Sequence, residues 1–139
     1  MADRLSNPEH EHPYEARPGI KVSRSSFNLR WLGELGVGEP RLILDVGAYD
    51  LGDSIRFKEA YPDARVVSFE ADPGRNAIIE RYYREFGVEH NFKAVSDREG
   101  TVEWFPSACR HANLNEDSGP QGSMYRHTDL YRTTFAHVH

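Results

Sequence analysis

Two acidic residues, Asp45 and Glu70, stand where short apolar segments of the 139-residue chain come to an end. Asp45 interrupts the apolar run 42–46, which Gly47 follows, and Glu70 closes the segment 65–70. A carboxylate at the end of a buried strand is costly unless a turn amide or a polar or cationic ligand group binds it. An acid after the second strand of a nucleotide-binding fold commonly accepts hydrogen bonds from the ribose hydroxyls. These two acids therefore predict a nucleoside site.

The elements around these acids follow from hydrophobic pattern and turn residues. A short apolar run closed by glycine, as at 42–46, is typical of a buried strand in a parallel sheet. Gly47 allows a sharp turn close to a ligand, and Asp72 and Pro73 suit the cap and first position of a helix. In chain order we expect a helix at 27–35 capped by Ser26, a strand at 42–46, a helix at 53–61, a strand at 65–70, a helix from 73 to about 86, and strands at 88–95 and 101–105.

Alternating strands and helices predict an α/β fold built from right-handed βαβ units. We expect a three-layer, Rossmann-like sheet with helices on both faces, in a single domain at residues 25–139. Residues 1–24 contain Pro8, Pro13 and Pro18 and show no hydrophobic periodicity. They are predicted to be an arm that precedes the domain.

Composition excludes several classes of function. The net charge of −5 argues against a nucleic-acid partner, which would require clustered Lys and Arg. A single cysteine, Cys109, excludes an internal disulfide and fits a reducing compartment. No apolar run approaches the ~20 residues of a membrane span, and the first residues lack an apolar signal region. We therefore expect a cytoplasmic protein without a membrane partner, and no metal site, because the histidines lack the spacing of a ligand cluster.

The turn after the first strand of this predicted sheet narrows the choice of nucleoside. Its spacing, Gly-Ala-Tyr-Asp-Leu-Gly at 47–52, differs from G-x-G-x-x-G, and no P-loop sequence follows. Asp45, Asp50 and Asp53 would repel a pyrophosphate, whereas they suit a cationic ligand. S-adenosylmethionine carries a sulfonium and an ammonium group and no phosphate, so it is the expected cofactor. A dinucleotide remains the alternative ligand, and a binding competition between NAD and S-adenosylmethionine would distinguish the two.

Three motifs in order resemble the FkbM family of class I methyltransferases. They are Leu-Asp-Val-Gly-Ala at 44–48, Val-Ser-Phe-Glu-Ala-Asp-Pro at 67–73 and Ala-Val-Ser-Asp-Arg-Glu-Gly at 94–100, with a weaker match, Gly-Ser-Met-Tyr, at 122–125. The resemblance implies S-adenosylmethionine-dependent methylation of a hydroxyl on a small molecule or glycan.

The resemblance also implies which residues hold the cofactor. Asp45, Gly47, Ala48 and Tyr49 would line its methionine part. Glu70 would hold the ribose hydroxyls. The implied adenine contacts are Ala71 on one side and Ala94 and Val95 on the other.

The chain also departs from the family pattern. Leu51 stands in the turn where the family has a smaller residue, and the later strands of the family are missing, so the fold would be truncated after its third or fourth strand. The strand at 42–46 would then keep an open edge, which is a liability. Residues 124–139, a partner chain or a second copy in a homo-oligomer would cover it, or the chain is a fragment. No catalytic base can be named, and a catalytically inactive cofactor-binding or interaction module remains the alternative function.

Overall fold

The computed structural model describes residues 14–22, 28–105 and 125. Contacts divide the chain into two compact units, Met1–Val95 and Ser96–His139. The helices and strands named below all belong to the first unit. In the described part of the second unit, residues 101–104 lack regular structure and Phe105 forms only an isolated bridge. The predicted strand at 101–105 is therefore wrong.

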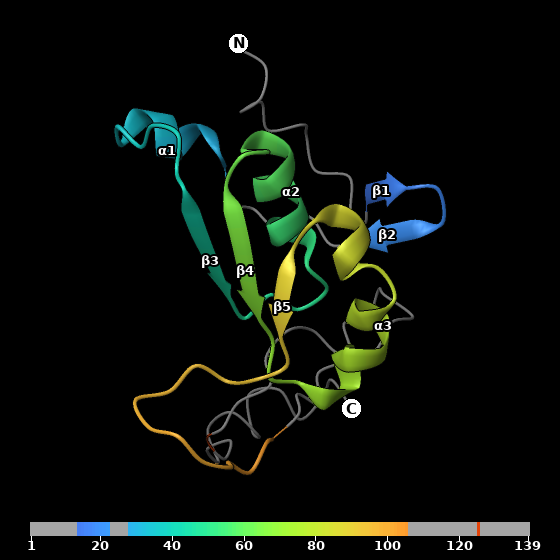
Figure 1. The fold of residues 1–139 in the computed structure, drawn as a ribbon. Coiled ribbons are helices and arrows are strands. Elements are labelled where there is room, and N and C mark those ends of the chain that lie inside the picture. Colours follow the sequence, from blue (N-terminus) through green and yellow to red (C-terminus); the bar gives the residue numbers. More distant parts are fainter. Residues whose placement is uncertain (1–13, 23–27, 106–124, 126–139) are drawn as a thin grey trace, which may run out of the picture. The chain divides into compact units, whose positions relative to one another are not determined.

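The centre of the first unit is a parallel sheet of three strands in the order β3, β4, β5 (Figure 1). The strands are β3 (Leu42–Val46), β4 (Arg65–Phe69) and β5 (Glu89–Asn91). β3 and β4 confirm the first two predicted strands to within a residue. β5 is much shorter than the predicted 88–95. The result is a mixed α/β unit whose parallel sheet is compatible with a Rossmann-like fold.

The helix α2 (Gly52–Ala60) connects β3 to β4 and confirms the helix predicted at 53–61. The next predicted helix is broken into three short pieces, η1 (Pro73–Arg75), α3 (Asn76–Glu80) and η2 (Tyr83–Phe86). The break occurs at Tyr82, whose φ of −142° is not helical. The Tyr82 hydroxyl donates a hydrogen bond of 2.7 Å to the carbonyl oxygen of Asp50. Its tertiary contact therefore competes with continuation of the helix.

The segment expected to be an arm contains an antiparallel hairpin, β1 (Tyr14–Arg17) and β2 (Ile20–Val22). Residues 14–22 of the predicted arm therefore form regular structure. The missed signal is the Pro18-Gly19 pair, since proline followed by a glycine with positive φ, here 78°, is typical of a tight turn. Val22 is fully buried, so the hairpin contributes to the core.

The helix before the sheet, α1 (Arg30–Glu34), has five residues and is shorter than the predicted 27–35. The expected cap, Ser26, lies outside the described residues. Leu29 is buried against Ala60, Tyr61 and Ala64 at the far end of α2. Trp31 and Leu35 are exposed, so only one side of this segment joins the core.

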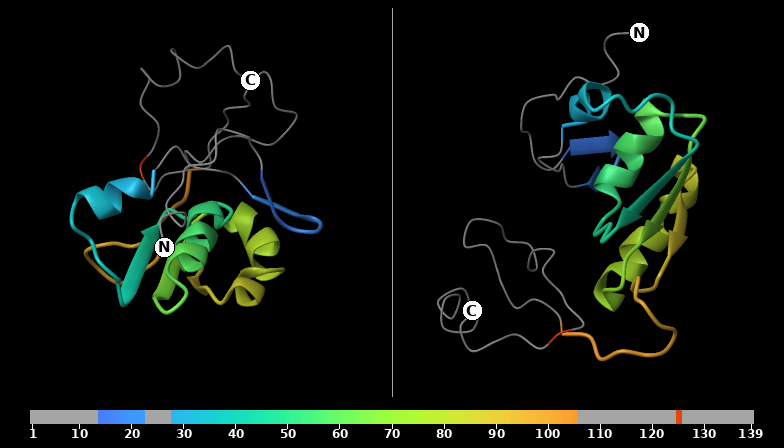
Figure 2. Two further views of the ribbon diagram at one scale, coloured as in Figure 1. Left: turned by 90° about the horizontal axis from the view of Figure 1, so that it is seen from above. Right: turned by 90° about the vertical axis from the view of Figure 1, so that its left-hand side faces the viewer.

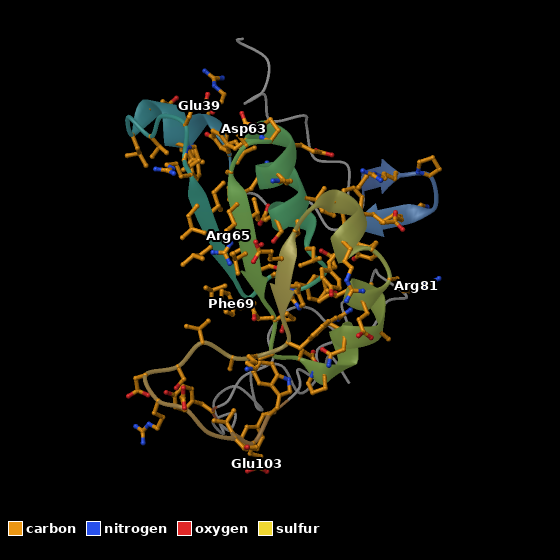
Figure 3. All side chains as sticks on the ribbon, viewed as in Figure 1. Glu39, Asp63, Arg65, Phe69, Arg81 and Glu103 are labelled. Atoms are coloured by element: carbon orange, nitrogen blue, oxygen red, sulfur yellow. The ribbon has the colours of Figure 1, made fainter. Side chains whose placement is uncertain are left out.

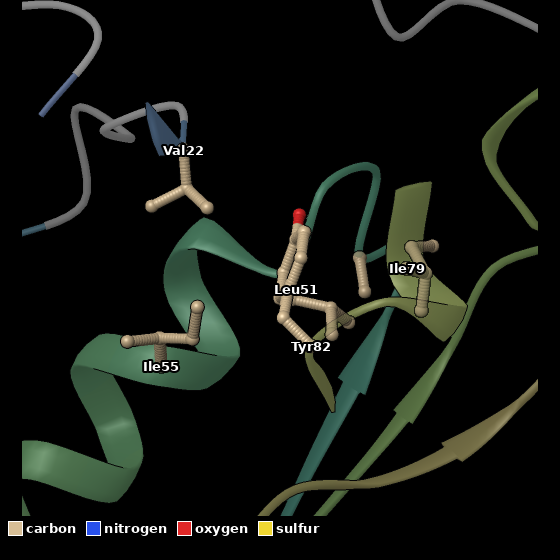
Figure 4. Packing of buried hydrophobic residues seen from close by; sticks show 6 residues of the cluster. Val22, Leu51, Ile55, Ile79 and Tyr82 are labelled. Carbon is tan, nitrogen blue, oxygen red and sulfur yellow. The ribbon is translucent and has the colours of Figure 1, made fainter. Parts of the chain in front are cut away.

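The main core joins the hairpin, the loop after β3, α2 and the helical segment before β5 (Figure 4). Leu51, Ile55 and Ile79 are fully buried there, and Tyr82 lies against them. This cluster fixes the start of α2 and the loop that precedes it. It therefore positions the carboxyl end of β3.

The two faces of the sheet differ. On one face, which α2 covers (Figure 2), Ile43 packs against the buried cluster that also contacts Phe57 of α2. On the other face Leu42, Leu44 and Val46 are 50%, 59% and 60% exposed. Arg65 and Phe69 of β4 share this second face, because each pairs with a β3 residue on it (Figure 3). No helix in the described part of the first unit covers this face. The expectations of a strand buried on both sides and of helices on both faces are therefore wrong for these residues.

Candidate functional site

Parallel pairing brings the ends of β3 and β4 together. Val46 lies opposite Phe69, so the residues that follow, Gly47 and Glu70, come to the same edge of the sheet. The amides of Gly47 and Ala48 both donate to the carbonyl oxygen of Phe69, at 2.9 and 3.0 Å. The loop after β3 is thus attached to the end of β4. The carboxyl edge of a parallel sheet is where ligands bind in open α/β folds.

Glu70 is the polar centre of this edge. Its side chain is buried, and its carboxylate accepts two backbone amides. Tyr49 donates to Oε2 at 2.7 Å, and Asp72 donates to Oε1 at 2.7 Å. Because an ionised carboxylate has about four lone-pair positions, roughly two remain for further donors. Glu70 can therefore accept ligand hydroxyls in addition to the two amides.

Asp45 points to the helix-covered face, where its partner is Ser54 in the first turn of α2. The Ser54 hydroxyl donates to Oδ2 of Asp45 at 2.5 Å. Burial raises the pKa of Asp45, although the hydrogen bond from Ser54 opposes the shift. The carboxylates of Asp53 and Glu70 raise this pKa further. Two further acids of this edge therefore lie close enough to Asp45 to disfavour its charged form.

The loop between β3 and α2 has an unusual backbone. Tyr49 and Leu51 have φ values of 51° and 67°, in the left-handed region that non-glycine residues seldom adopt. Leu51 offsets its strain by full burial in the core. Tyr49 is held by the hydrogen bond to Glu70 and by the guanidinium of Arg75, which lies 4.1 Å from the centre of its ring. The loop is therefore fixed by tertiary contacts, and Leu51 accommodates the turn although it is larger than the residue that the resemblance implies there.

The remaining predicted site residues do not all lie at the edge beside Glu70. Ala71 directly follows Glu70 and is partly buried, so it belongs to the same edge. Ala94 and Val95 come after the end of β5 at Asn91, in chain without regular structure, and Val95 is exposed. The amide of Glu70 donates to the carbonyl oxygen of Asn91 at 3.1 Å. Asn91, not Ala94, is therefore the β5 residue beside Glu70. The sequence placed the end of this strand too late.

Three residues of the site were not predicted as part of it. Ser54 binds the carboxylate of Asp45, Asp72 donates its amide to Glu70, and Arg75 stacks on Tyr49. The sequence suggested Asp72 only as a helix cap, a role confirmed by its side chain, which accepts from the Gly74 amide at 2.8 Å. The signal for Arg75 was its place on the turn after Glu70. Its stacking partner lies on a different loop, so no local pattern could reveal the pair.

The described part of the chain also bears on metal binding and on membrane insertion. Within it, no three His, Cys, Asp or Glu side chains are arranged to hold a metal ion. None of the helices described there is long and apolar enough to cross a membrane.

Comparison with known proteins gives one informative similarity. The chain is 32% identical over 95 residues to the 2-O-methyltransferase NoeI of Sinorhizobium fredii (strain NBRC 101917 / NGR234). The chain is related to a methyltransferase. The aligned residues make up 67% of this chain and 39% of NoeI, so the chain spans well under half the length of this relative. No family model matches the chain, and no solved structure does.

Proposed function

We propose that this chain forms the S-adenosylmethionine-binding part of a methyltransferase of the FkbM type. The observation that carries the proposal is the meeting of the loop at 47–51 with Glu70 at the carboxyl edge of a parallel sheet. The relationship to a 2-O-methyltransferase supports the same conclusion. The acceptor would be a hydroxyl group of a small molecule or a glycan.

The chemistry of the edge fits this cofactor. The carboxylates of Asp53 and Glu70 lie near enough to Asp45 to raise its pKa, so three acids meet at this edge, where Arg56 pairs with Asp53 at 2.8 Å. Such an edge favours a sulfonium and an ammonium group and opposes a pyrophosphate. Glu70 retains acceptor positions for the two ribose hydroxyls. These features favour S-adenosylmethionine over a dinucleotide.

Each residue has a separate task in this proposal. Gly47 and Ala48 present backbone to the methionine part, and a side chain at Gly47 would meet no protein atom within 4 Å. Glu70 holds the ribose, and Ala71 lies beside the adenine. When bound, the cofactor supplies a methyl group activated by its positive sulfur. The protein accelerates transfer by holding the cofactor where an acceptor oxygen can approach in line.

The test is calorimetric titration of the purified chain with S-adenosylhomocysteine, with NAD titrated in parallel. We expect saturable binding of S-adenosylhomocysteine in the micromolar range, about −8 kcal/mol, and no competition from NAD. Binding of NAD alone would overturn the choice of cofactor. Binding of neither ligand by a folded chain would overturn the proposal. Binding without methyl transfer to any hydroxyl acceptor would leave a cofactor-binding module as the function of this chain.

A further inference from the structure

The Glu70 carboxylate joins the two loops that border the candidate site. Oε2 accepts the amide of Tyr49 in the loop after β3, and Oε1 accepts the amide of Asp72 in the turn after β4. Both distances are 2.7 Å, as expected for strong hydrogen bonds to an ionised acceptor. One buried side chain therefore sets the separation of the two loops.

The geometry of the first loop shows why such a connection is needed. Tyr49 adopts a left-handed backbone conformation, which costs a residue with a side chain roughly 1–2 kcal/mol. Unlike Leu51, Tyr49 is not fully buried, so core packing contributes less to holding it in place. The hydrogen bond to Glu70 and the stacking of Arg75 act on this one residue. Both of these contacts come from the segment that follows β4.

We propose that Glu70 is a positioning residue that holds the loop at 47–51 against the turn at 71–75 before any ligand arrives. This role is additional to acceptance of ribose hydroxyls, and its effect on the cofactor rests on the function proposed above. Glu70 preorganises the site through two of its acceptor positions and leaves the others for ligand. Ligand affinity then depends on Glu70 even where the ligand has no hydroxyl to offer.

The variant Glu70→Gln separates the two roles. Glutamine has nearly the same size, but one carboxylate oxygen becomes an NH2 group, which cannot accept a backbone amide. At least one of the two amides, Tyr49 or Asp72, must then lose its acceptor. Glu80→Gln is the matched control, because Glu80 is exposed on α3 and the change of charge is the same.

The first measurement uses the ligand-free chain, so it does not depend on the proposed function. Amide hydrogen exchange followed by NMR should be at least about tenfold faster at Tyr49 or Asp72 in Glu70→Gln. The Tyr61 amide, which donates to the carbonyl oxygen of Phe57 at the other end of α2, should be unchanged, and Glu80→Gln should match the wild type throughout. Equal exchange at both loop amides in Glu70→Gln and wild type would overturn the proposal.

The second measurement compares S-adenosylhomocysteine with its 2′,3′-dideoxy analogue, which lacks both ribose hydroxyls. If Glu70 only accepted ribose hydroxyls, its substitution would weaken binding of S-adenosylhomocysteine and leave binding of the analogue unchanged. If Glu70 positions the loops, Glu70→Asp, which keeps the negative charge of the edge, should weaken binding of both ligands, with a loss of at least about fivefold for the analogue. An unchanged affinity for the analogue would contradict the positioning role.

A second variant keeps the proposal testable if Glu70→Gln does not fold. Glu70→Asp retains the charge but withdraws the carboxylate by one methylene, so it should also accelerate exchange at one of the two amides. Absence of ligand binding by the wild type would refute the proposed function alone, since the exchange measurement would still decide the role of Glu70.

Discussion

The substitution Gly47→Ala tests the backbone of the loop that ends β3. Gly47 has a φ of 85°, in the left-handed region, and a Cβ added there would meet no atom within 4 Å. The cost of the substitution is therefore backbone strain without a steric clash. A left-handed residue with a side chain loses roughly 1–2 kcal/mol, and alanine recovers about 0.4–1 kcal/mol by stiffening the unfolded chain. We expect a net loss of about 0.5–1.5 kcal/mol in the free energy of unfolding.

Gly38 provides a matched control for this substitution. It also has open space around an added Cβ, but its φ is not positive. Gly38→Ala should therefore be neutral or stabilising by up to about 1 kcal/mol. Because the unfolded-state contribution is the same in both variants, their difference isolates the strain, about 1–2 kcal/mol.

Urea unfolding followed by circular dichroism measures both variants. Equal free energies of unfolding for Gly47→Ala and Gly38→Ala would refute the left-handed conformation at Gly47. The same variants test the proposed cofactor site by calorimetry, since in that proposal the new methyl group at residue 47 would face the ligand. Gly47→Ala should weaken S-adenosylhomocysteine binding, and Gly38→Ala should not. If Gly47→Ala binds as the wild type does, the ligand does not pass over Gly47.

Three further predictions concern the sheet and its charges. Burial raises the pKa of Asp45, so ionisation of this carboxyl destabilises the folded state. The wild type should therefore lose stability relative to Asp45→Asn as the pH rises from about 4 through the raised pKa. Parallel plots of unfolding free energy against pH for the two proteins would contradict this prediction. Ile55 is fully buried, so Ile55→Ala should lower the free energy of unfolding in urea by about 2–5 kcal/mol. Leu44 is exposed on the uncovered face, so Leu44→Thr should change that free energy by less than about 0.5 kcal/mol. A large loss of stability in Leu44→Thr would mean that this face is covered in solution. The hydrogen bond from Arg65 lowers the pKa of Glu89, so the stability that this exposed ion pair contributes should be lost as the pH falls through the lowered pKa. Arg65→Gln should abolish this dependence of stability on pH, and high salt should weaken the dependence in the wild type.

Local sequence signals were sufficient for the first βαβ unit. The apolar runs at 42–46 and 65–70 became β3 and β4, and the helix between them lies within one residue of its predicted bounds. The motif Asp72-Pro73 also behaves as predicted, since Asp72 caps the turn that Pro73 begins. These features depend on neighbouring residues, so periodicity and capping rules could find them.

Prediction failed where distant contacts decide the conformation. The helix expected from 73 to about 86 is broken at Tyr82, whose hydroxyl donates to the carbonyl oxygen of Asp50 in the loop before α2. The strand expected at 88–95 has only three residues, Glu89–Asn91, so Ala94 and Val95 lie beyond the sheet. Leu44 follows the apolar pattern of a strand covered on both sides, but no described helix of its unit covers its face. A pattern of hydrophobic residues shows which side chains can be buried, but it does not show whether another element packs over them.

The sequence by itself determined the order of β3, α2 and β4 and the placement of Asp45, Gly47 and Glu70 near the ends of parallel strands. It did so because strand period, glycine turns and helix caps are local properties of the chain. Only the tertiary structure decided how these residues are used. It directs Asp45 to Ser54 and brings the amides of Tyr49 and Asp72 to the two oxygens of Glu70. These contacts depend on the register between β3 and β4 and on the packing of Leu51, which no single segment of the sequence contains.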